Sequence, residues 1–377
     1  MSWFADYCEE AAQTDQLSRD GNHVALLATG LFGEAGSVLA ELKKTVRERG
    51  AYPSYQNRLT EEVGDLLWYF ARLVSVLAPS DVRKLGELAE RAGQHDDHAD
   101  GQPIREALAL GSAAGALLAT LQHSTDNVIP SQLGTIWRAL LGVAARAGID
   151  VRQAADKNLD KTQSRWPSER DFTPLFDKRF DETERIPRRL DVEFRQIQRG
   201  DKHAVLLRCK GLNIGDRLTD NIDDSDFYRF HDVFHLAHAV YLGWSPVVRV
   251  LLNCKRKSDP RVDENQDGAR ARIIEEAVSA IVFSRAKETR FYDGIDQVDY
   301  DLLKTITEFV RGFEVQDVPL WQWEAAILNG YRVFRALRDN HGGTVTADLI
   351  NRDLRYATPS PSWRAGDAVG SLMGVEA

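Results

Sequence analysis

The chain has 377 residues and a formal net charge of −9, from 48 Lys and Arg against 57 Asp and Glu. Roughly 150 residues per domain predicts two or three domains, large enough to form a core without disulfides. The acidic balance argues against an extended nucleic-acid partner or an anionic membrane surface. With its cysteines far apart in sequence and no apolar run of about 20 residues, we expect a soluble, cytoplasmic protein with no membrane partner.

The first part of the chain has a helical pattern. Apolar residues recur at steps of three and four over 24–44 and 59–77, which predicts a helical hairpin within residues 20–80. A further helix is predicted over 82–93. The polar segment 94–103, rich in His and Asp, is interpreted as a connector.

A weak internal repeat follows the connector. Residues 114–121 resemble 35–42, and residues 132–143 resemble 62–73. A fused duplication would make 104–167 a degenerate repeat of the first hairpin, and its last helix is predicted over 151–165. Chance similarity between two helices rich in Ala and Leu is the alternative.

The second half begins after a charged segment, 171–189, that is interpreted as a linker or an irregular wrap. Strand-like patterns over 190–197 and 204–209 predict a β-hairpin. The basic turn at 255–257 is expected to be solvated surface. Helices are predicted at roughly 228–242, 247–253, 268–285, 300–313, 320–340 and 347–352. The predicted fold is therefore mainly α, with domains at 1–170 and 190–358 and a flexible tail at 359–377.

Four acids lie on the two helices of the first hairpin. Glu34 and Glu41 are two helical turns apart and share a face, as do Glu62 and Asp65, which are three residues apart. Carboxylates that converge repel one another, and Mg²⁺ relieves this repulsion while also binding phosphate oxygens. Ordinary solvated helix acids are the alternative interpretation.

Glycines accompany these acids in the helix interiors. Gly36 and Gly64 each cost roughly 1 kcal/mol relative to Ala at such positions. Their presence suggests close packing around a shared charged centre.

The sequences G-E-A-G around Glu34 and L-T-E-E-V-G-D-L-L-W around Glu62 resemble the MazG-like, all-α nucleoside triphosphate pyrophosphohydrolase family. The resemblance implies a helical bundle in which Glu34, Glu62 and Asp65 hold Mg²⁺ against a triphosphate. The chain departs from the family pattern at Ser37, where a second Glu is expected. Glu41, one turn further along the same face, could supply the missing ligand on geometric grounds.

The resemblance spans about residues 20–167 and includes the family's closing helix near 148–167. Asn158 and Lys161 of that helix, and Lys43 of the first hairpin, are candidate contacts to the nucleotide or its phosphates. In the second hairpin Ala113, Gln132 and Thr135 stand where the first carries its three acids, so that copy could not hold the metal. The family also implies a bundle assembled from two subunits, and we therefore expect a homodimer.

These features predict Mg²⁺-dependent hydrolysis of an NTP or dNTP to a nucleoside monophosphate and pyrophosphate, with Mn²⁺ as an alternative ion. We expect this hydrolysis to remove damaged nucleotides, or to deplete nucleotides during stress or phage attack. A nucleotide-binding regulator that lost catalysis at Ser37 is a second hypothesis.

A histidine-rich helix lies in the second half. His231 and His235 are separated by one turn, a spacing at which two imidazoles can bind one metal. Glu275 and Glu276 of a later helix could add a carboxylate, and Glu276 is the preferred candidate. Buried, hydrogen-bonded histidines are the alternative. The segment R-F-H-D-V-F-H and the turn L-G-W-S-P look like a C-terminal companion domain found appended to MazG-like domains. A metal phosphohydrolase centred on this helix is a third hypothesis.

Overall fold

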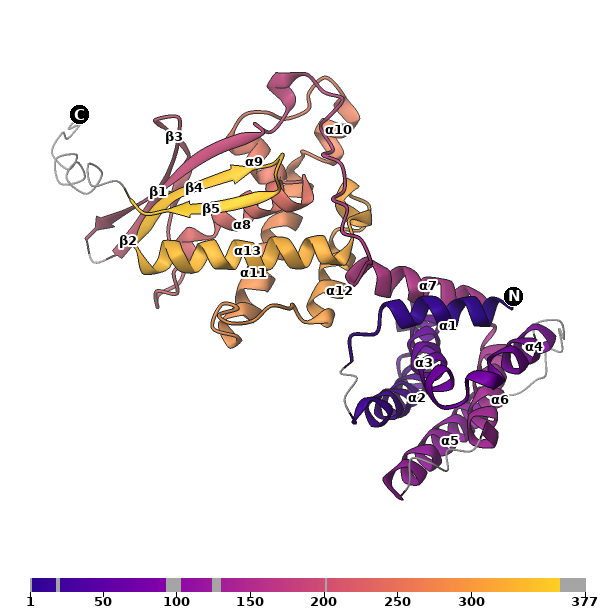
Figure 1. Cartoon of the computed structure of the whole chain (residues 1–377). Helices are drawn as coiled ribbons and strands as arrows, with labels where there is room; N and C mark the ends of the chain where they lie inside the picture. The colour runs from indigo at the N-terminus through magenta and orange to yellow at the C-terminus, as the bar shows by residue number, and fades with distance from the viewer. Residues whose placement is uncertain (1, 18–20, 93–102, 124–129, 201, 360–377) are drawn as a thin grey trace, which may run out of the picture. The chain divides into compact units, whose positions relative to one another are not determined.

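The computed structural model describes residues 2–17, 21–92, 103–123, 130–200 and 202–359. The chain divides into two compact units, Met1–Glu169 and Arg170–Ala377, each with its own hydrophobic core (Figure 1). Most of the predicted connector at 94–103, and nearly all of the predicted tail, lie outside the described residues.

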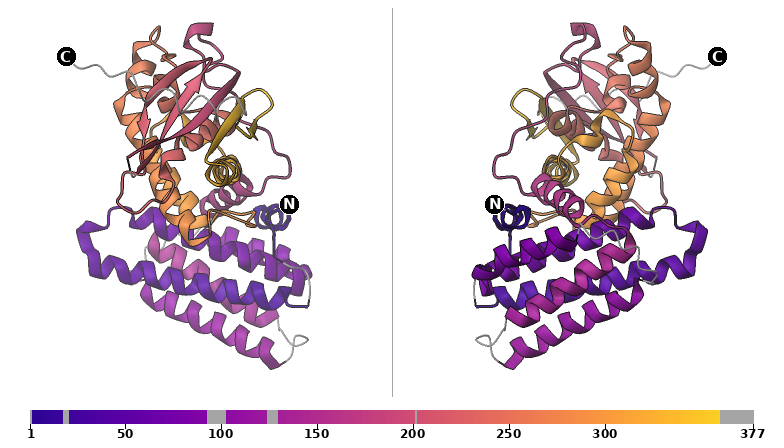
Figure 2. Two further views of the ribbon diagram at one scale, coloured as in Figure 1. Left: turned by 90° about the vertical axis from the view of Figure 1, so that its left-hand side faces the viewer. Right: turned by 90° about the vertical axis from the view of Figure 1, so that its right-hand side faces the viewer.

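The first unit is built from α-helices (Figure 2). Helix α3 is central and packs against α1, α2, α6 and α7, while α2 also packs along α5, and α5 along α6. The two predicted hairpins are therefore formed by α2–α3 and α5–α6. The helices are α1 (Trp3–Gln13), α2 (His23–Glu48), α3 (Tyr55–Leu77), α4 (Val82–Ala92), α5 (Ile104–His123), α6 (Pro130–Ala147) and α7 (Val151–Arg165).

The core of this unit follows from the apolar spacing of α3. Leu59, Val63, Leu66 and Phe70 recur at steps of three and four and are all buried. The ring of Phe70 stacks on Trp137 of α6 with centroids 4.9 Å apart. This packing holds α3 in the middle of the bundle, with its polar face turned toward α2 and α7.

Two helices differ from the expectation that no segment could cross a membrane. The segments His23–Ala51 and Ile104–Leu121 are long and apolar enough to do so by length and composition alone. Both also contribute to the core of the first unit, through residues such as Leu31 and Leu117, which are fully buried. Core helices commonly pass this test, so it is weak evidence for a membrane span.

The predicted β-hairpin is present and belongs to a larger antiparallel sheet with the order β3-β2-β1-β4-β5. The β2–β3 turn uses Lys210 and Gly211, whose positive φ angles of 51° and 81° suit a tight two-residue hairpin. The strands are β1 (Arg189–Arg199), β2 (Lys202–Cys209), β3 (Leu212–Leu218), β4 (Gly342–Asp348) and β5 (Asp353–Ala357).

Helices α8 and α13 of the second unit pack against the sheet (Figure 1). A π-helical turn, His238–Leu242, continues α8, and the short 3₁₀ turn Tyr228–Phe230 precedes it. The longer helices α11 and α13 agree with their predicted positions. The helices are α8 (Asp232–Ala237), α9 (Pro246–Leu251), α10 (Pro260–Asn265), α11 (Ala269–Glu288), α12 (Tyr300–Phe309) and α13 (Leu320–Asp339).

The helix predicted over 347–352 is wrong. Ala347 is fully buried at the end of β4 and pairs with Leu190 of β1. The Asp348 carboxylate then accepts hydrogen bonds from the backbone N–H groups of Ile350 and Asn351, which forms the turn into β5. Strand pairing and this Asp-centred turn override the local helical pattern.

The segment 171–189 packs as part of the second unit and is not a free linker. Leu175 and Ile186 lie in its core, and Asp177 is 1% exposed. The Asp177 carboxylate forms ion pairs with Arg188 at 2.7 Å and with Arg249 at 3.1 Å. Buried ion pairs thus tie this charged stretch to the helices.

The basic turn 255–257 also differs from the expectation of solvated surface, because Arg256 is 1% exposed. Its guanidinium pairs with Asp267 at 2.6 Å and with Glu314 at 2.6 Å. Two carboxylates, one 11 residues and the other 58 residues further along the chain, permit this burial.

All three cysteines are free and buried, Cys8 in the first unit and Cys209 and Cys254 in the second. Burial raises the pKa of the Cys8 and Cys254 thiols to about 11.

Candidate functional site

Three of the predicted acids meet in the first unit. Glu34 projects from α2, while Glu62 and Asp65 project from α3. One carboxylate oxygen from each lies within 4.8 Å of the others, and all three side chains are partly exposed. The helical spacing that placed Glu62 and Asp65 on one face of α3 therefore directs both toward α2.

The electrostatics of this cluster are those of crowded carboxylates. Burial and the neighbouring charges of Asp65 and Glu62 raise the pKa of Glu34 to about 7. Lys161 and a hydrogen bond with the Ser37 side chain act in the opposite direction but do not overcome them. Around neutral pH the cluster thus holds excess negative charge that a proton or a cation can neutralise.

Helix α7 supplies the polar groups opposite Asp65. The Asn158 amide donates a hydrogen bond to Asp65 Oδ1 at 2.8 Å, and the Lys161 ammonium forms an ion pair with the same oxygen. The Tyr7 hydroxyl of α1 donates to Asn158 Oδ1 at 3.0 Å and orients its amide. The sequence interpretation singled out Asn158 and Lys161 but missed Tyr7. The contact between Tyr7 and Asn158 joins residues 151 positions apart in the chain, so sequence spacing gave no signal for it.

The two glycines of the acidic helices differ in their surroundings. A Cβ atom on Gly64 would lie 2.8 Å from the Ala154 carbonyl oxygen and 3.1 Å from Asn158 Cβ, so only glycine permits this approach of α3 to α7. No heavy atom lies within 4 Å of the corresponding position on Gly36. The expected close packing therefore holds at Gly64 and not at Gly36.

Glu41 does not join the cluster. Its carboxylate is bound by the Lys44 ammonium and the Tyr52 hydroxyl, and it is 4% exposed. Despite burial, these partners lower its pKa. Glu41 is thus committed to a contact between α2 and the loop before α3, which does not support its predicted role as a fourth ligand.

Lys43 is exposed on α2, and the neighbouring Lys44, rather than Lys43, contacts an acid of this helix.

In the second hairpin the Gln132 amide donates to Thr120 Oγ1 at 2.9 Å, linking α6 to α5. That hairpin carries none of the three cluster acids at the corresponding positions, in keeping with the sequence comparison.

A second cluster lies in the other unit. His231, Asp232 and His235 bring ligand atoms within 4.8 Å of one another, and all three are buried. Glu276 of α11 faces them, with its carboxylate oxygens 3.4 Å from His235 Nε2 and 3.9 Å from His231 Nε2. The structure therefore brings together the three residues predicted for this site and adds Asp232, 3.1 Å from His231 Nε2.

Glu275, the neighbour of Glu276 on α11, is fully buried beside the histidines. It accepts hydrogen bonds from His235 Nδ1, His238 Nδ1, the Ser245 hydroxyl and the backbone N–H of Val247. These donors overcome the effect of burial and lower its pKa to about 2. Burial opposes protonation of His235, but Glu275 and Glu276 outweigh this effect and raise its pKa.

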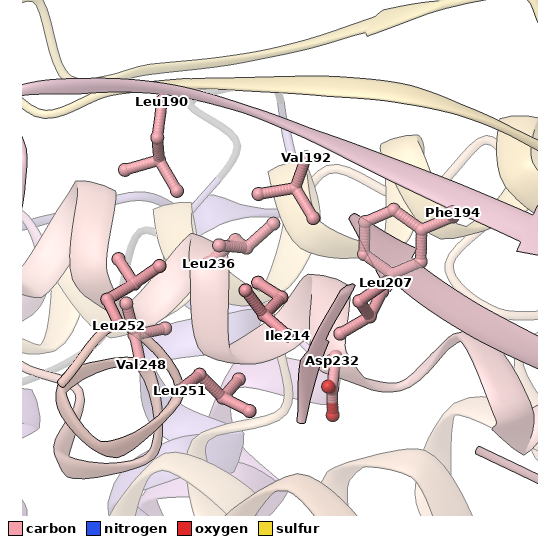
Figure 3. Close-up of a pocket in the computed structure, with 10 residues that line it drawn as sticks. All are labelled: Leu190, Val192, Phe194, Leu207, Ile214, Asp232, Leu236, Val248, Leu251 and Leu252. Atoms are coloured by element: carbon pink, nitrogen blue, oxygen red, sulfur yellow. The ribbon is translucent and has the colours of Figure 1, made fainter. Parts of the chain in front are cut away.

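A small cavity adjoins this cluster beneath the sheet, and Figure 3 shows Asp232 at its edge with the carboxylate directed away from the aliphatic side chains. The cavity has a volume of about 10 Å³, room for one water molecule. It is too small for a substrate. The residues around it are Leu190, Val192, Phe194, Leu207, Ile214, Asp232, Leu236, Val248, Leu251 and Leu252.

Comparison with known proteins identifies the second unit. The family model described as the MazG C-terminal domain matches residues 171–360, half of the chain. The chain belongs to the MazG C-terminal domain family. Membership in a MazG family points, at family level, to nucleotide pyrophosphohydrolases. The match begins at 171, so the packed segment 171–189 is part of the MazG C-terminal domain.

A curated relative is the Gene 37 protein of Mycobacterium phage L5, which is 36% identical over 56 residues. The alignment covers 14% of this chain and 49% of that protein, so the chain spans about half the length of the relative it matches. No solved structure matches this MazG-family chain.

Within the MazG C-terminal domain, sequence reasoning identified His231 and His235, offered Glu275 and Glu276 as possible carboxylate ligands, and assigned no ligand role to Asp232. The His-Asp dipeptide was a usable signal for Asp232, since the two residues start one helix. Nothing in the sequence distinguishes Glu275 from Glu276, because only the packing of α11 decides which carboxylate is buried.

Proposed function

We propose that the first unit is a Mg²⁺-dependent nucleoside triphosphate pyrophosphohydrolase. The convergence of Glu34, Glu62 and Asp65 is the observation that carries the proposal. Octahedral Mg²⁺ with bonds of 2.0–2.1 Å separates its ligand oxygens by about 2.9–4.2 Å. The three oxygens lie within 4.8 Å of one another, so small side-chain rotations would bring them to that spacing.

The chemistry of the donors supports the same ion. Partly exposed carboxylates suit a hard cation that retains waters and binds phosphate oxygens. When bound, Mg²⁺ would neutralise phosphate charge. A carboxylate of the cluster that is bound to the ion would orient a water and accept its proton. The water oxygen would attack the α-phosphorus as the bond to the bridging oxygen breaks, giving a nucleoside monophosphate and pyrophosphate.

Helix α7 gives the site a means of responding to the substrate. Lys161 neutralises Asp65 in the present arrangement and lies 4.0 Å from Glu61. A bound Mg²⁺ would take over Asp65, and the ammonium would then be available to the triphosphate. Asn158, held by Tyr7, would keep the Asp65 carboxylate in place.

The test is pyrophosphate release from a panel of NTPs and dNTPs with Mg²⁺. We expect wild type to be active and Glu62→Gln to lose at least a hundredfold in kcat. Glu87→Gln is the matched control, because Glu87 makes an exposed pair with Arg83 at 3.8 Å on α4. Equal activity of Glu62→Gln and Glu87→Gln would overturn the proposal.

A specific observation favours a second candidate function. Ser37 replaces an expected carboxylate and Glu41 is engaged elsewhere, so the site has three carboxylates and a reduced capacity for metal. A nucleotide-binding regulator is consistent with this deficit. Binding of Mg²⁺-NTP without any pyrophosphate release, measured by calorimetry on the same proteins, would support it over the enzyme.

We further propose that the chain forms a homodimer through the first unit. Helices α2 and α5 leave the large apolar side chains of Leu26, Phe32 and Leu108 exposed by 42%, 45% and 60%. Light scattering should give a dimer mass for wild type and a monomer mass for Phe32→Asp. A monomeric wild type would contradict this part of the proposal.

A further inference from the structure

The MazG C-terminal domain buries an arrangement of histidines and carboxylates that the proposed hydrolase does not use. His231 precedes α8, and Asp232 and His235 lie on it, while Glu276 comes from α11, which packs against α8. His235 is 0% exposed, and His231 and Asp232 are 7% and 6% exposed. Burying this many ionisable groups is unfavourable unless each finds a partner.

The hydrogen bonds of the two imidazoles define which nitrogen faces the centre of the cluster. His231 Nδ1 donates to the Tyr228 carbonyl at 2.9 Å, and the Tyr228 ring stacks on the imidazole with centroids 4.3 Å apart. His235 Nδ1 donates to Glu275 Oε1 at 2.9 Å. Both Nε2 atoms are therefore turned toward Asp232 and Glu276. A cation that displaced the Nε2 proton could be bound there by either ring.

The centre of the cluster contains one buried ring nitrogen that the described structure leaves unsatisfied. His235 Nε2 is buried without a hydrogen-bond partner. Its 3.4 Å contact with Glu276 Oε1 is an ion-pair distance that lacks hydrogen-bond geometry. Ligand atoms of His231, Asp232 and His235 lie within 4.8 Å of one another, and the Glu276 carboxylate lies beside both imidazoles. Such an arrangement of donors suits a cation.

We propose that the MazG C-terminal domain binds one divalent transition-metal ion through His231 Nε2, Asp232, His235 Nε2 and Glu276. Tetrahedral coordination with bonds of about 2.0–2.1 Å separates ligand atoms by roughly 3.3–3.4 Å. The distance from His231 Nε2 to Asp232 Oδ1 is 3.1 Å. Glu276 lies 3.4 Å from His235 Nε2 through Oε1 and 3.9 Å from His231 Nε2 through Oε2, so its carboxylate would turn to offer one oxygen to the ion.

The groups behind the ligands match those that orient metal-bound histidines. A carboxylate or a carbonyl that accepts the other ring N–H fixes the tautomer of a ligating imidazole. Glu275 does this for His235, and the Tyr228 carbonyl does it for His231. We assign Glu275 to this supporting role because both its oxygens already accept hydrogen bonds, one of them from Ser245 at 2.7 Å.

The ligand types indicate the class of ion, and the exposure of Glu276 indicates how the ion could enter. Two imidazoles with two carboxylates favour Zn²⁺, Mn²⁺, Fe²⁺ or Co²⁺ over Mg²⁺, for which all-oxygen sites are preferred. The Glu276 side chain is 45% exposed, so the site opens to solvent on that side. An ion there could keep a water ligand. The two units would thus take different metals.

The experiment uses the full-length chain without an affinity tag, stripped with EDTA and then titrated with Zn²⁺ by calorimetry and with Co²⁺ by visible spectroscopy. We expect one ion per chain and Co²⁺ absorption bands typical of nitrogen and oxygen ligands. Glu276→Gln, which is isosteric and partly exposed, should weaken Zn²⁺ binding at least tenfold, and His231→Asn should do the same.

Three controls keep the result specific. His203→Asn removes an exposed histidine of β2 and should leave binding unchanged. Glu62→Gln alters the other unit and should also leave Co²⁺ bands intact, while Glu276→Gln should retain pyrophosphate release. Circular dichroism confirms that each variant is folded. Failure of stripped wild type to bind either ion, or wild-type affinity in folded Glu276→Gln and His231→Asn, would overturn the proposal.

Discussion

Ser37 is the position at which a single side chain decides how many carboxylates surround the candidate metal. Its side chain hydrogen-bonds to Glu34, one turn earlier on α2, and helps to stabilise the charged form of that acid. A serine therefore supports an existing ligand where a glutamate would add one. The sequence predicted the convergence of these acids from helical periodicity, which places Glu62 and Asp65 on one face of α3, together with the family resemblance, which adds Glu34. It could not predict the loss of Glu41, whose partner Tyr52 lies in an irregular loop.

Ser37→Glu should increase metal affinity, because it adds a fourth carboxylate next to Glu34. We expect Mg²⁺ to bind about tenfold more tightly, a gain of roughly 1.4 kcal/mol, when measured by calorimetry. Ser37→Gln is the matched control, with the same shape and no charge. Equal affinity of the two variants would show that position 37 does not reach the ion.

Asp15 allows a prediction about stability and pH. Its carboxylate pairs with Arg72 at 3.0 Å and accepts from His23 at 3.0 Å. Burial opposes ionisation of Asp15, but the Leu17 backbone N–H, Arg72 and His23 together lower its pKa. The stability that it contributes is therefore present above the unfolded pKa near 4 and is lost as pH falls through the lower folded value.

Asp15→Asn should lower the free energy of unfolding by about 3 kcal/mol at pH 7, because Arg72 would be left buried without its charge partner. The difference from wild type should shrink as pH falls below about 4, in urea titrations at pH 7, 5 and 3. Glu87→Gln, at an exposed pair, should change stability by less than about 0.5 kcal/mol. A difference that stays constant down to pH 3 contradicts this assignment.

At the scale of elements, the long helices of both units follow their apolar periodicity closely. The exceptions have identifiable causes. Residues 347–352 form the end of β4 and a turn because β1 provides a pairing partner, which local periodicity cannot reveal. Arg256 is buried because Asp267 and the more distant Glu314 both pair with its guanidinium. Contacts between distant segments thus decided the features that the sequence alone could not.

Gly64→Ala and Gly36→Ala form a matched pair on the two acidic helices. The added methyl at Gly64 would meet the Ala154 carbonyl at 2.8 Å and push α3 from α7. We expect a loss of about 1–3 kcal/mol from overpacking. At Gly36 the methyl meets open space, so the higher helix propensity of Ala should stabilise the protein by up to about 1 kcal/mol.

Urea denaturation measures both effects, and pyrophosphate release gives a second measurement. Gly64→Ala should also reduce activity, since Asn158 and Lys161 would move with α7. Stabilisation by both variants would mean that α3 and α7 are not in close contact at Gly64.

For the whole molecule, the division into two units separates the two proposed metal sites. One cluster offers partly exposed carboxylates, and the other offers two buried imidazoles, of which Glu275 orients that of His235. Each unit also has a separate hydrophobic core, so ligand binding should stabilise mainly the unit that contains the site.

In differential scanning calorimetry, we therefore expect Mg²⁺ to raise the midpoint temperature of one unfolding transition and Zn²⁺ to raise that of the other. An ion at a hundred times its Kd contributes about 2.7 kcal/mol. This corresponds to roughly 5–10 °C for units of this size. Glu62→Gln should abolish only the Mg²⁺ shift, and Glu276→Gln only the Zn²⁺ shift. A variant in one unit that removes both shifts would contradict the separation.

The buried thiols make it possible to tell which transition belongs to which unit. A thiol that is shielded and almost entirely protonated reacts with iodoacetamide only when its surroundings open. Cys8 therefore reports melting of the first unit, and Cys254 reports melting of the second. Peptide mapping of the alkylated chain along a temperature ramp would follow both halves in one sample, without any introduced label.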